Sequence, residues 1–497
     1  MGKTEPVAAQ GPPTLSRQGV WTRLKSVPRE VIAAAALLVL YLSVYSGRFY
    51  SPDGMLMFRQ AEALVFDHSI HLEHPVWGFG PIRESAYGIG LSLVYAPFVA
   101  LTGLFVQHAP TSPTLVIGGQ ADWAFYTQEL YHDPIYRFIA PIHIVIAVAA
   151  VWMVARLVLA FGFGRREALW AMAFCGVASP WLIYSRGDFA QPLEGLCWVA
   201  AFLCALKRGR GAEAGLAFAV FYAILTRPVE GSMLAAVCLV LVIPRWSVTI
   251  ATAVGGATGI AATVLVDLAR FGWPIHSGYP SDVGWTASPA GLAGLLWSPA
   301  RGLIWWFPAL LLAPVGFVVL WRFHRRLAAS IGLASIALFL SSGFWSVWWG
   351  GLDWGPRLML PGIPVLAALA GIGMTRVPSP VGIAAAAVGF LTCAPALILD
   401  IFRGYGTQAG TPSGSFDWLN YPPNQFLTWL QHRSATDILG RPLLHGDVDI
   451  YWAHVSEYKL VLAVAVLAEL ALLFVFIRGH SSRLRDRGRP GGRLPAG

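Results

Sequence analysis

The residues best suited to chemistry are a few carboxylates and arginines that stand at the ends of long apolar segments. Asp53 lies between Pro52 and Gly54, a few residues after the first of these segments. Charged side chains near membrane depth are costly, so they are usually paired or functional. A carboxylate can deprotonate an acceptor hydroxyl group, and arginines can hold a phosphate group bidentately. This set of residues therefore suits the transfer of a sugar from a polyprenyl phosphate.

Asp53 also has a plainer interpretation. The sequence Ser51-Pro52-Asp53-Gly54 is favourable for a turn, in which Asp53 would be a structural residue. Its place directly after the first apolar segment, on the side expected to face outward, favours a functional role. Both interpretations stay open at this point.

The composition is that of a polytopic membrane protein. Of the 497 residues, 56% are hydrophobic and 12% are charged, whereas soluble domains carry about 25% charged residues. Many apolar runs of about 17–25 residues can each cross a bilayer core of about 30 Å. The net charge of +9 resides in short loops and tails, which is the pattern of cytoplasmic loops and not of a nucleic-acid-binding surface. All five cysteines fall inside apolar runs, so neither a disulfide nor a CxxC metal site is predicted.

The positions of the basic loops predict the topology. Residues 1–30 are polar and basic and form a cytoplasmic tail without a cleavable signal. An apolar run at 89–106 contains Pro97 and two glycines, and nearly every short basic loop falls inside if this run does not cross. We therefore predict an all-α polytopic membrane protein with about twelve transmembrane helices and both ends inside. The predicted crossings are 31–46, 136–160, 167–184, 190–206, 212–226, 231–244, 248–268, 302–321, 327–346, 358–374, 380–399 and 457–477.

The same topology divides the chain into segments. The first outer loop, 47–134, carries the run 89–106 and an amphipathic helix expected at 54–66 on the membrane surface. This loop belongs to a transmembrane bundle that spans residues 31–400. The remaining segments are an outer polar segment at 401–456, a last transmembrane helix at 457–477 and a basic cytoplasmic tail at 478–497.

Several fragments on the predicted outer side carry a family resemblance. They are Asp53 in the first outer loop and the stretches 87–90, 96–98, 190–194, 225–228, 298–303 and 348–357. With these fragments the chain resembles the GT-C glycosyltransferases, polytopic enzymes that use polyprenyl-phosphate sugars on the extracytoplasmic side. The resemblance covers most of residues 45–360 and implies a GT-C-like bundle with amphipathic surface helices in the first outer loop. Mannosyl-type members carry Asp-Glu at the catalytic position, whereas Gly54 follows Asp53 here, which argues against protein O-mannosylation.

The resemblance implies roles for particular residues. Asp53 is expected to be the general base of an inverting transfer. The outer arginines Arg227, Arg301 and Arg357 are expected to bind the donor phosphate. Snorkelling to the lipid headgroups is the alternative for Arg301 and Arg357. The acceptor or sugar pocket is expected to comprise Glu84, Tyr87, Trp349, Asp353 and Trp354.

Simpler roles stay open for some of the acidic residues. Arg83 and Glu84 could form a local ion pair on the surface, which would contribute little to stability. Asp353 could be an ion-pair partner of one of the arginines. Asp188 and Glu194 flank a turn and could supply a second acid or a metal ligand.

The expected function is that of a hexosyl- or pentosyltransferase acting on a cell-envelope glycan, a glycolipid or a protein. The alternatives are a transporter or flippase of a lipid-linked sugar, which would use the same arginines, and a scaffold subunit of an envelope complex. No cofactor is predicted with certainty and no metal ligands are assigned, although a divalent metal is possible. The high Ala, Gly and Arg content suggests a bacterial source. The protein is therefore expected in a bacterial plasma membrane, with its site facing the periplasm or the cell exterior.

Overall fold

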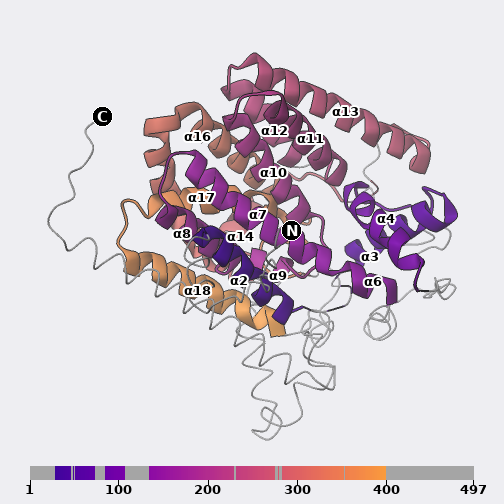
Figure 1. Ribbon diagram of the computed structural model, residues 1–497, viewed down its shortest axis with the longest axis horizontal. Coiled ribbons are helices and arrows are strands. Elements are labelled where there is room, and N and C mark those ends of the chain that lie inside the picture. Colours follow the sequence, from indigo (N-terminus) through magenta and orange to yellow (C-terminus); the bar gives the residue numbers. More distant parts are fainter. Residues whose placement is uncertain are drawn as a thin grey trace, which may run out of the picture.

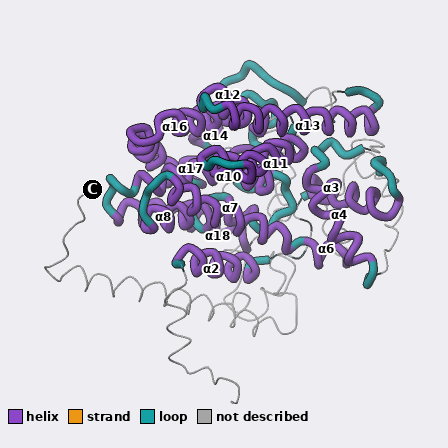
Figure 2. The backbone as a smooth tube through the Cα atoms, turned by 45° about the horizontal axis from the view of Figure 1, so that its top comes forward, coloured by secondary structure: helices purple, strands orange, loops and turns teal. Residues whose placement is uncertain are grey.

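The computed structural model describes residues 28–45, 47, 49, 51–72, 84–106, 134–228, 231–274, 278, 283–351 and 353–398. Within these ranges the regular structure is helical, and the β contact is an isolated bridge between Trp285 and Trp345. Figure 2 shows the helices and the loops that join them. The predicted all-α class is therefore confirmed for this part of the chain. The segments predicted at 1–27, 401–456, 457–477 and 478–497 lie outside it.

The helices fall close to the predicted crossings, because most apolar runs end at Gly, Pro or basic residues. The elements are α2 (Arg29–Ser43), α3 (Pro52–Glu62), the π-helical turn η1 (Ala63–Asp67), α4 (Gly90–Gly103), α6 (Pro134–Ile139), α7 (Pro141–Ala160), α8 (Arg165–Gly176), α9 (Trp181–Tyr184), α10 (Gln191–Leu206), α11 (Arg210–Thr226), α12 (Gly231–Val242), α13 (Trp246–Phe271), α14 (Ala290–Trp297), α15 (Leu303–Trp306), η3 (Pro308–Leu312), α16 (Ala313–Gly343), η4 (Arg357–Gly362), α17 (Ile363–Gly373) and α18 (Ser379–Ile398).

Four helical stretches in the described residues are long and apolar enough to cross a membrane. They are Pro141–Ala160, Trp246–Phe271, Pro308–Gly343 and Ser379–Leu397. Shorter apolar helices accompany them, among them α10, α12 and the stretch Arg357–Gly373. These helices support a multi-pass membrane protein, and the number of twelve crossings stays a prediction.

The helix α16 is a hairpin of two segments. His324 has a non-helical backbone (φ −138°, ψ 59°) in its middle. A Cβ added to Gly332 would lie 2.9 Å from the ring of Phe317, although a straight helix would separate these two residues by about 22 Å. The chain therefore reverses at the basic stretch 322–326, as expected for two crossings at 302–321 and 327–346.

The core of the bundle is α17, in which every residue is buried. It packs against α16, α8, α7 and α10. Its small residues allow close approach of neighbouring backbones, since a Cβ on Gly371 would lie 2.6 Å from the carbonyl oxygen of Glu167. Because η4 leads directly into α17, residues at the start of η4 are anchored to the buried centre of the bundle.

The helices α3, α4 and α6 lie together at one side of the bundle, near one end of α13 (Figures 1 and 2). With 14 residues, α4 is about 21 Å long, and that the run 89–106 does not cross stays a prediction. The expected amphipathic helix at 54–66 corresponds to α3 and η1. However, Gln60 and Glu62 are buried, so α3 packs on several sides and does not lie with its polar face in water.

Candidate active site

The sequence around Asp53 forms the start of helix α3. Ser51 is the N-cap, and its Oγ accepts a hydrogen bond from the backbone N–H of Gly54 at 3.0 Å. Pro52 occupies the first turn, where proline is favoured. Asp53 therefore lies in the first turn of a helix, where the helix dipole stabilises a negative charge. The isolated turn that the sequence also allowed is not what forms.

Gly54 makes room for a buried carboxylate. A Cβ at this position would collide with the carboxyl group of Asp188. Asp188 is buried, and its Oδ1 accepts a hydrogen bond from the Oγ of Ser51 at 2.9 Å. The close contact gives a physical reason for a glycine after Asp53, at the point where the chain departs from the Asp-Glu pattern.

The carboxylate of Asp53 bonds to two groups from distant parts of the chain. The Tyr87 hydroxyl donates to Oδ1 at 2.7 Å, and Nη1 of Arg357 donates to Oδ2 at 2.6 Å. The side chains of Asp53 and Arg357 are 19% and 14% exposed. Asp53, Tyr87 and Arg357, three of the residues predicted for the site, therefore meet at a partly exposed position.

Arg357 is held on several sides. Its Nε lies 2.8 Å from Oδ2 of Asp353, and Nη2 donates to the backbone carbonyl of Gly350. The guanidinium carbon lies 4.6 Å from the centre of the Phe189 ring, a cation–π contact. These contacts fix the plane of the guanidinium group while Nη1 points at Asp53.

Asp353 lies behind Arg357 and is fully buried. Its Oδ1 lies 2.7 Å from Nη1 of Arg301, whose Nη2 donates to the Gly351 carbonyl at 3.0 Å. Burial raises the pKa of Asp353 to about 6, although Arg301 and Arg357 pull it down. The carboxylates and guanidinium groups thus alternate in a row Asp53–Arg357–Asp353–Arg301, in which the formal charges cancel.

The backbone of the loop before Arg357 accepts hydrogen bonds from Arg357 and Arg301. Gly350 and Gly351 have φ of +86° and +93°, a left-handed region that glycine adopts without strain. Their carbonyls turn toward Arg357 and Arg301 respectively. The Trp-Trp-Gly-Gly stretch thereby forms a backbone cradle for the ion-pair row.

Other predicted residues lie in separate interactions. Arg227 pairs with Glu194, which is buried, at 3.6 Å. Oε1 of Glu84 lies 2.6 Å from Nδ1 of His71. The surface ion pair predicted between Arg83 and Glu84 stays a prediction, because Arg83 lies outside the described residues.

The predicted sugar-pocket residues differ in exposure. Asp353 and Trp354 are buried, and the Tyr184 hydroxyl donates to the Trp354 carbonyl at 2.8 Å. Both support the cradle and present no exposed surface to a sugar in this conformation. Trp349 and Tyr87 are half-buried and lie at the rim.

Arg270 is a site-supporting residue that the sequence did not reveal. It lies in the last turn of α13 and is buried. Its Nη1 donates to the carbonyl of Tyr87 at 2.8 Å, and its Nη2 donates to Oε1 of Gln60 at 3.2 Å. Arg270 therefore ties the loop that carries Tyr87 to helix α3. The available signal was an arginine at the end of a long apolar run, directly before Phe271-Gly272.

Within the described ranges, no group of three or more His, Cys, Asp or Glu side chains is placed to hold a metal ion. Asp188 and Glu194, considered above as metal ligands, face Ser51 and Arg227. The question of a divalent metal stays open.

Comparison with known proteins gives a likeness of fold. The crystal structure of ArnT from Cupriavidus metallidurans in the apo state matches with 16% identity and a TM-score of 0.50, covering 94% of this chain and 78% of that chain. The structure of ArnT bound to undecaprenyl phosphate matches with 14% identity and a TM-score of 0.48, covering 90% and 76%. No family model and no curated protein sequence matches. ArnT is a GT-C polyprenyl-phosphate-dependent glycosyltransferase, and the likeness to it supports an ArnT-like fold for this chain.

Proposed function

We propose that this protein is a membrane glycosyltransferase that moves a sugar from a polyprenyl-phosphate donor to a hydroxyl group of an extracytoplasmic acceptor. The observation that carries the proposal is the ion pair of Asp53 with Arg357 at a partly exposed position, backed by a buried Asp353–Arg301 pair. The fold shared with ArnT, a polyprenyl-phosphate-dependent enzyme, supports the same class.

Arg357 is the group best placed to meet the donor phosphate. A phosphate oxygen competes with Asp53 for Nη1 of Arg357, because both are anions that accept charge-assisted hydrogen bonds. Asp353 and the Gly350 carbonyl keep the guanidinium in place during this exchange. Arg301 lies behind Asp353 and supports the row, and Arg227 is a second phosphate ligand only if it leaves Glu194.

Once the phosphate accepts from Nη1 of Arg357, the Asp53 carboxylate is released from its hydrogen bond to that nitrogen and can accept a proton. It takes the proton of the acceptor hydroxyl as the acceptor oxygen bonds to the anomeric carbon. The bond from that carbon to the phosphate oxygen breaks on the opposite face, and its electron pair leaves with the polyprenyl phosphate. The configuration is thereby inverted, and Arg357 stabilises the charge that develops on the phosphate.

Residues at the rim complete the proposed site. Tyr87 orients Asp53 through its 2.7 Å hydrogen bond, and Trp349 and Glu84 line the approach for the sugar and acceptor. The site faces the periplasm or the cell exterior of a bacterial plasma membrane. The acceptor is a cell-envelope glycan, a glycolipid or a protein.

The test is product formation by the purified protein. Incubation with a panel of polyprenyl-phosphate sugars and candidate acceptors should release polyprenyl phosphate and give a glycosylated product. The rival function is a flippase of lipid-linked sugars. Movement of such a lipid across a proteoliposome membrane, with the glycosyl phosphate bond intact, would replace our proposal with that function.

A further inference from the structure

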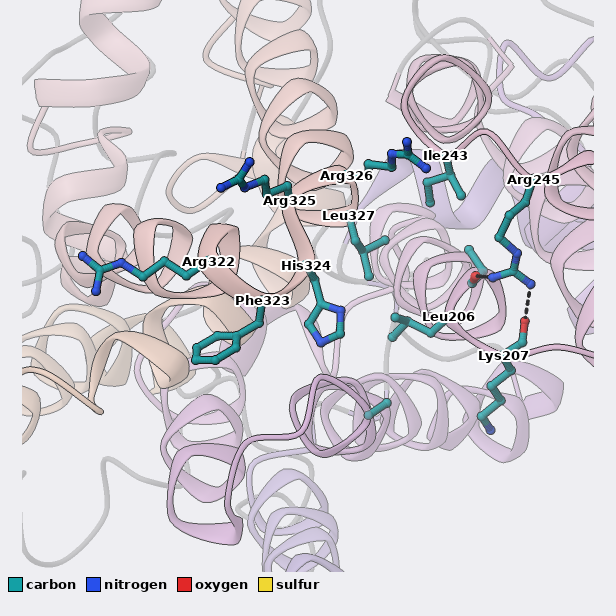
Figure 3. A pocket seen from close by; sticks show the side chains of 12 residues that line it. Leu206, Lys207, Ile243, Arg245, Arg322, Phe323, His324, Arg325, Arg326 and Leu327 are labelled. Atoms are coloured by element: carbon teal, nitrogen blue, oxygen red, sulfur yellow. Dashed lines mark hydrogen bonds between the residues drawn. The ribbon is translucent and has the colours of Figure 1, made fainter. Parts of the chain in front are cut away.

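A second polar site lies at another face of the bundle. A cavity of about 730 Å³ opens where α7, α10, α12, α13 and the hairpin of α16 end or begin (Figure 3). We call it the basic pocket. Its cationic or titratable lining residues are Lys207, Arg245, Arg322, His324, Arg325 and Arg326.

The basic pocket and the candidate active site lie at opposite ends of the same helices. Helix α10 begins beside Glu194, the partner of Arg227, and ends at Leu206, directly before Lys207. Its 16 residues span about 24 Å. The hairpin of α16 likewise starts after Arg301 and turns at His324. The pocket therefore lies on the side that the basic loops predict to be cytoplasmic.

Two of the lining residues build the wall of the pocket. Arg245 donates to the carbonyl oxygens of Ala205 and Lys207 at 2.8 and 2.9 Å, and so closes the end of α10 (Figure 3). Nε2 of His324 lies 3.2 Å from the carbonyl of Phe161, which holds the tip of the hairpin against the end of α7. These contacts fix the position of the tip relative to Lys207.

The remaining four cations are available to a ligand. Lys207, Arg322, Arg325 and Arg326 are exposed. Within the described residues, none of the four has a carboxylate within ion-pair distance. Several unpaired cations around one concave surface create a positive potential that attracts anions.

The surroundings of the basic pocket suit a lipid headgroup better than a soluble anion. Apolar side chains next to the cations are strongly exposed: Phe323 is 69% exposed and Trp246 is 83% exposed. Both stand at the ends of apolar helices, where aromatic residues anchor at the membrane interface. A ligand here meets cations on one side and exposed apolar side chains on the other.

We propose that the basic pocket binds the phosphate headgroup of an anionic phospholipid of the inner leaflet. The phosphodiester lies between Lys207 and Arg326, on the side of the pocket away from Arg322 (Figure 3), and the acyl chains run along the exposed apolar surface near Phe323 and Trp246. The bound lipid joins the α16 hairpin to the end of α10. Anionic membrane lipids attract basic residues near the surface in this way.

The experiment uses the full chain in nanodiscs of phosphatidylcholine with or without phosphatidylglycerol. Native mass spectrometry should show phosphatidylglycerol retained in preference to phosphatidylcholine, and the Tm should rise with phosphatidylglycerol. The variant Lys207→Gln/Arg326→Gln should lose this preference by on the order of tenfold, since the phosphodiester loses the two charge-assisted hydrogen bonds that define the site. The matched control is Arg208→Gln/Arg376→Gln, which removes two exposed cations from the same face outside the lining of the pocket.

Three results would overturn the proposal. An equal loss of the phosphatidylglycerol preference in the control variant would mean that the lipid responds to the overall surface charge and not to a specific site. Equal stabilisation by inorganic phosphate added to phosphatidylcholine nanodiscs would assign the pocket to a soluble phosphate. Retention by the wild-type protein that does not weaken with rising salt would also contradict it, because exposed ion pairs are screened by salt. The salt series needs no variant and therefore does not depend on whether a variant folds.

Discussion

At the scale of single residues, Asp53 has the two features that a base of this kind needs. Its carboxylate is oriented by the Tyr87 hydroxyl at 2.7 Å, and it is 19% exposed, so that an acceptor can approach. Its cationic partner, Arg357, is also the proposed ligand of the donor phosphate. Binding of the donor phosphate to Arg357 therefore also frees the Asp53 carboxylate from its ion pair.

Replacing Asp53 with Asn should remove the base with little change of shape. We expect turnover to fall by about 10²- to 10⁴-fold, the usual contribution of general base catalysis, with an unchanged elution volume in gel filtration. The measurement is the release of polyprenyl phosphate. Asp67→Asn, an exposed carboxylate after the same helix, is the matched control and should keep its activity. Near-normal turnover by Asp53→Asn would remove Asp53 from the mechanism.

Titration of the buried Asp353 should make the free energy of unfolding depend on pH. Burial raises its pKa from 3.8 to about 6, so the folded protein binds a proton in that window that the unfolded chain has released. This contribution to the free energy of unfolding is fully present below pH 3.8, the pKa in the unfolded chain, and is lost as the pH rises to about 6, the pKa in the folded protein. The difference corresponds to roughly 3 kcal/mol.

The measurement for Asp353 is the Tm in detergent over that pH range. The Tm of the wild-type protein should fall relative to that of Asp353→Asn as pH rises from about 4 to about 6, and the two curves should run parallel above pH 6. Asp353→Asn has a lower Tm at neutral pH because the buried Arg301 and the partly exposed Arg357 lose their carboxylate partner. Only the difference in slope therefore tests the pKa of Asp353. Parallel curves throughout would show that Asp353 does not titrate in this window.

At the scale of elements, the start of α3 depends on the absence of a side chain at Gly54. In Gly54→Ala the new Cβ would collide with the buried carboxyl group of Asp188, and such overpacking costs about 1–3 kcal/mol. We expect a lower Tm and at least a tenfold loss of turnover, since Asp53 moves with the helix start.

The control for Gly54→Ala is Gly256→Ala in helix α13. A Cβ at Gly256 has no neighbour within 4 Å, and alanine is favoured over glycine in a helix by up to about 1 kcal/mol. This variant should be as stable as the wild-type protein or more stable. Equal Tm and equal activity for the two alanine variants would show that the contact with Asp188 does not constrain the site.

The loop of Tyr87 should depend on Arg270 at the end of α13. Arg270→Gln removes the donor to the Tyr87 carbonyl, and we expect turnover to fall by about tenfold or more, with partial recovery in Arg270→Lys. A double-mutant cycle with Tyr87→Phe measures the coupling. If Arg270 acts through Tyr87, its substitution costs clearly less in the Tyr87→Phe background. Additive losses would instead mean a general structural role.

The positions of the helices were predictable from the sequence, and the partners of the charged residues were not. Apolar runs separated by basic turns predicted the hairpin at 322–326 and a helix over 190–206, which forms as Gln191–Leu206, because both signals are local. The Asp53–Arg357 ion pair joins residues 304 positions apart. The sequence predicted only that both residues lie on the outer side of the membrane. That Arg301 faces Asp353 while Arg227 faces Glu194 depends on how distant helices pack, which no local pattern encodes.

At the scale of the whole molecule, the proposals fix an orientation. The candidate active site and the basic pocket lie at opposite ends of α10, so that one faces outward if the other faces the cytoplasm. Four of the five cysteines are buried and Cys204 is partly buried, which leaves little background for labelling of introduced cysteines. Asp67 and Arg208 are exposed, and no crossing is predicted between Asp53 and Asp67.

The orientation can therefore be measured with a membrane-impermeant maleimide on spheroplasts. Asp67→Cys should react at once, and Arg208→Cys should react only after the membrane is permeabilised, because its loop carries the positive charge that is retained inside. Each variant is its own control through labelling in detergent. The reverse pattern would place Asp53 in the cytoplasm, away from an extracytoplasmic acceptor, and would place the basic pocket against the outer leaflet. A reversed result would thus contradict the acceptor side and the lipid proposal while leaving the ion-pair chemistry of Asp53 and Arg357 intact.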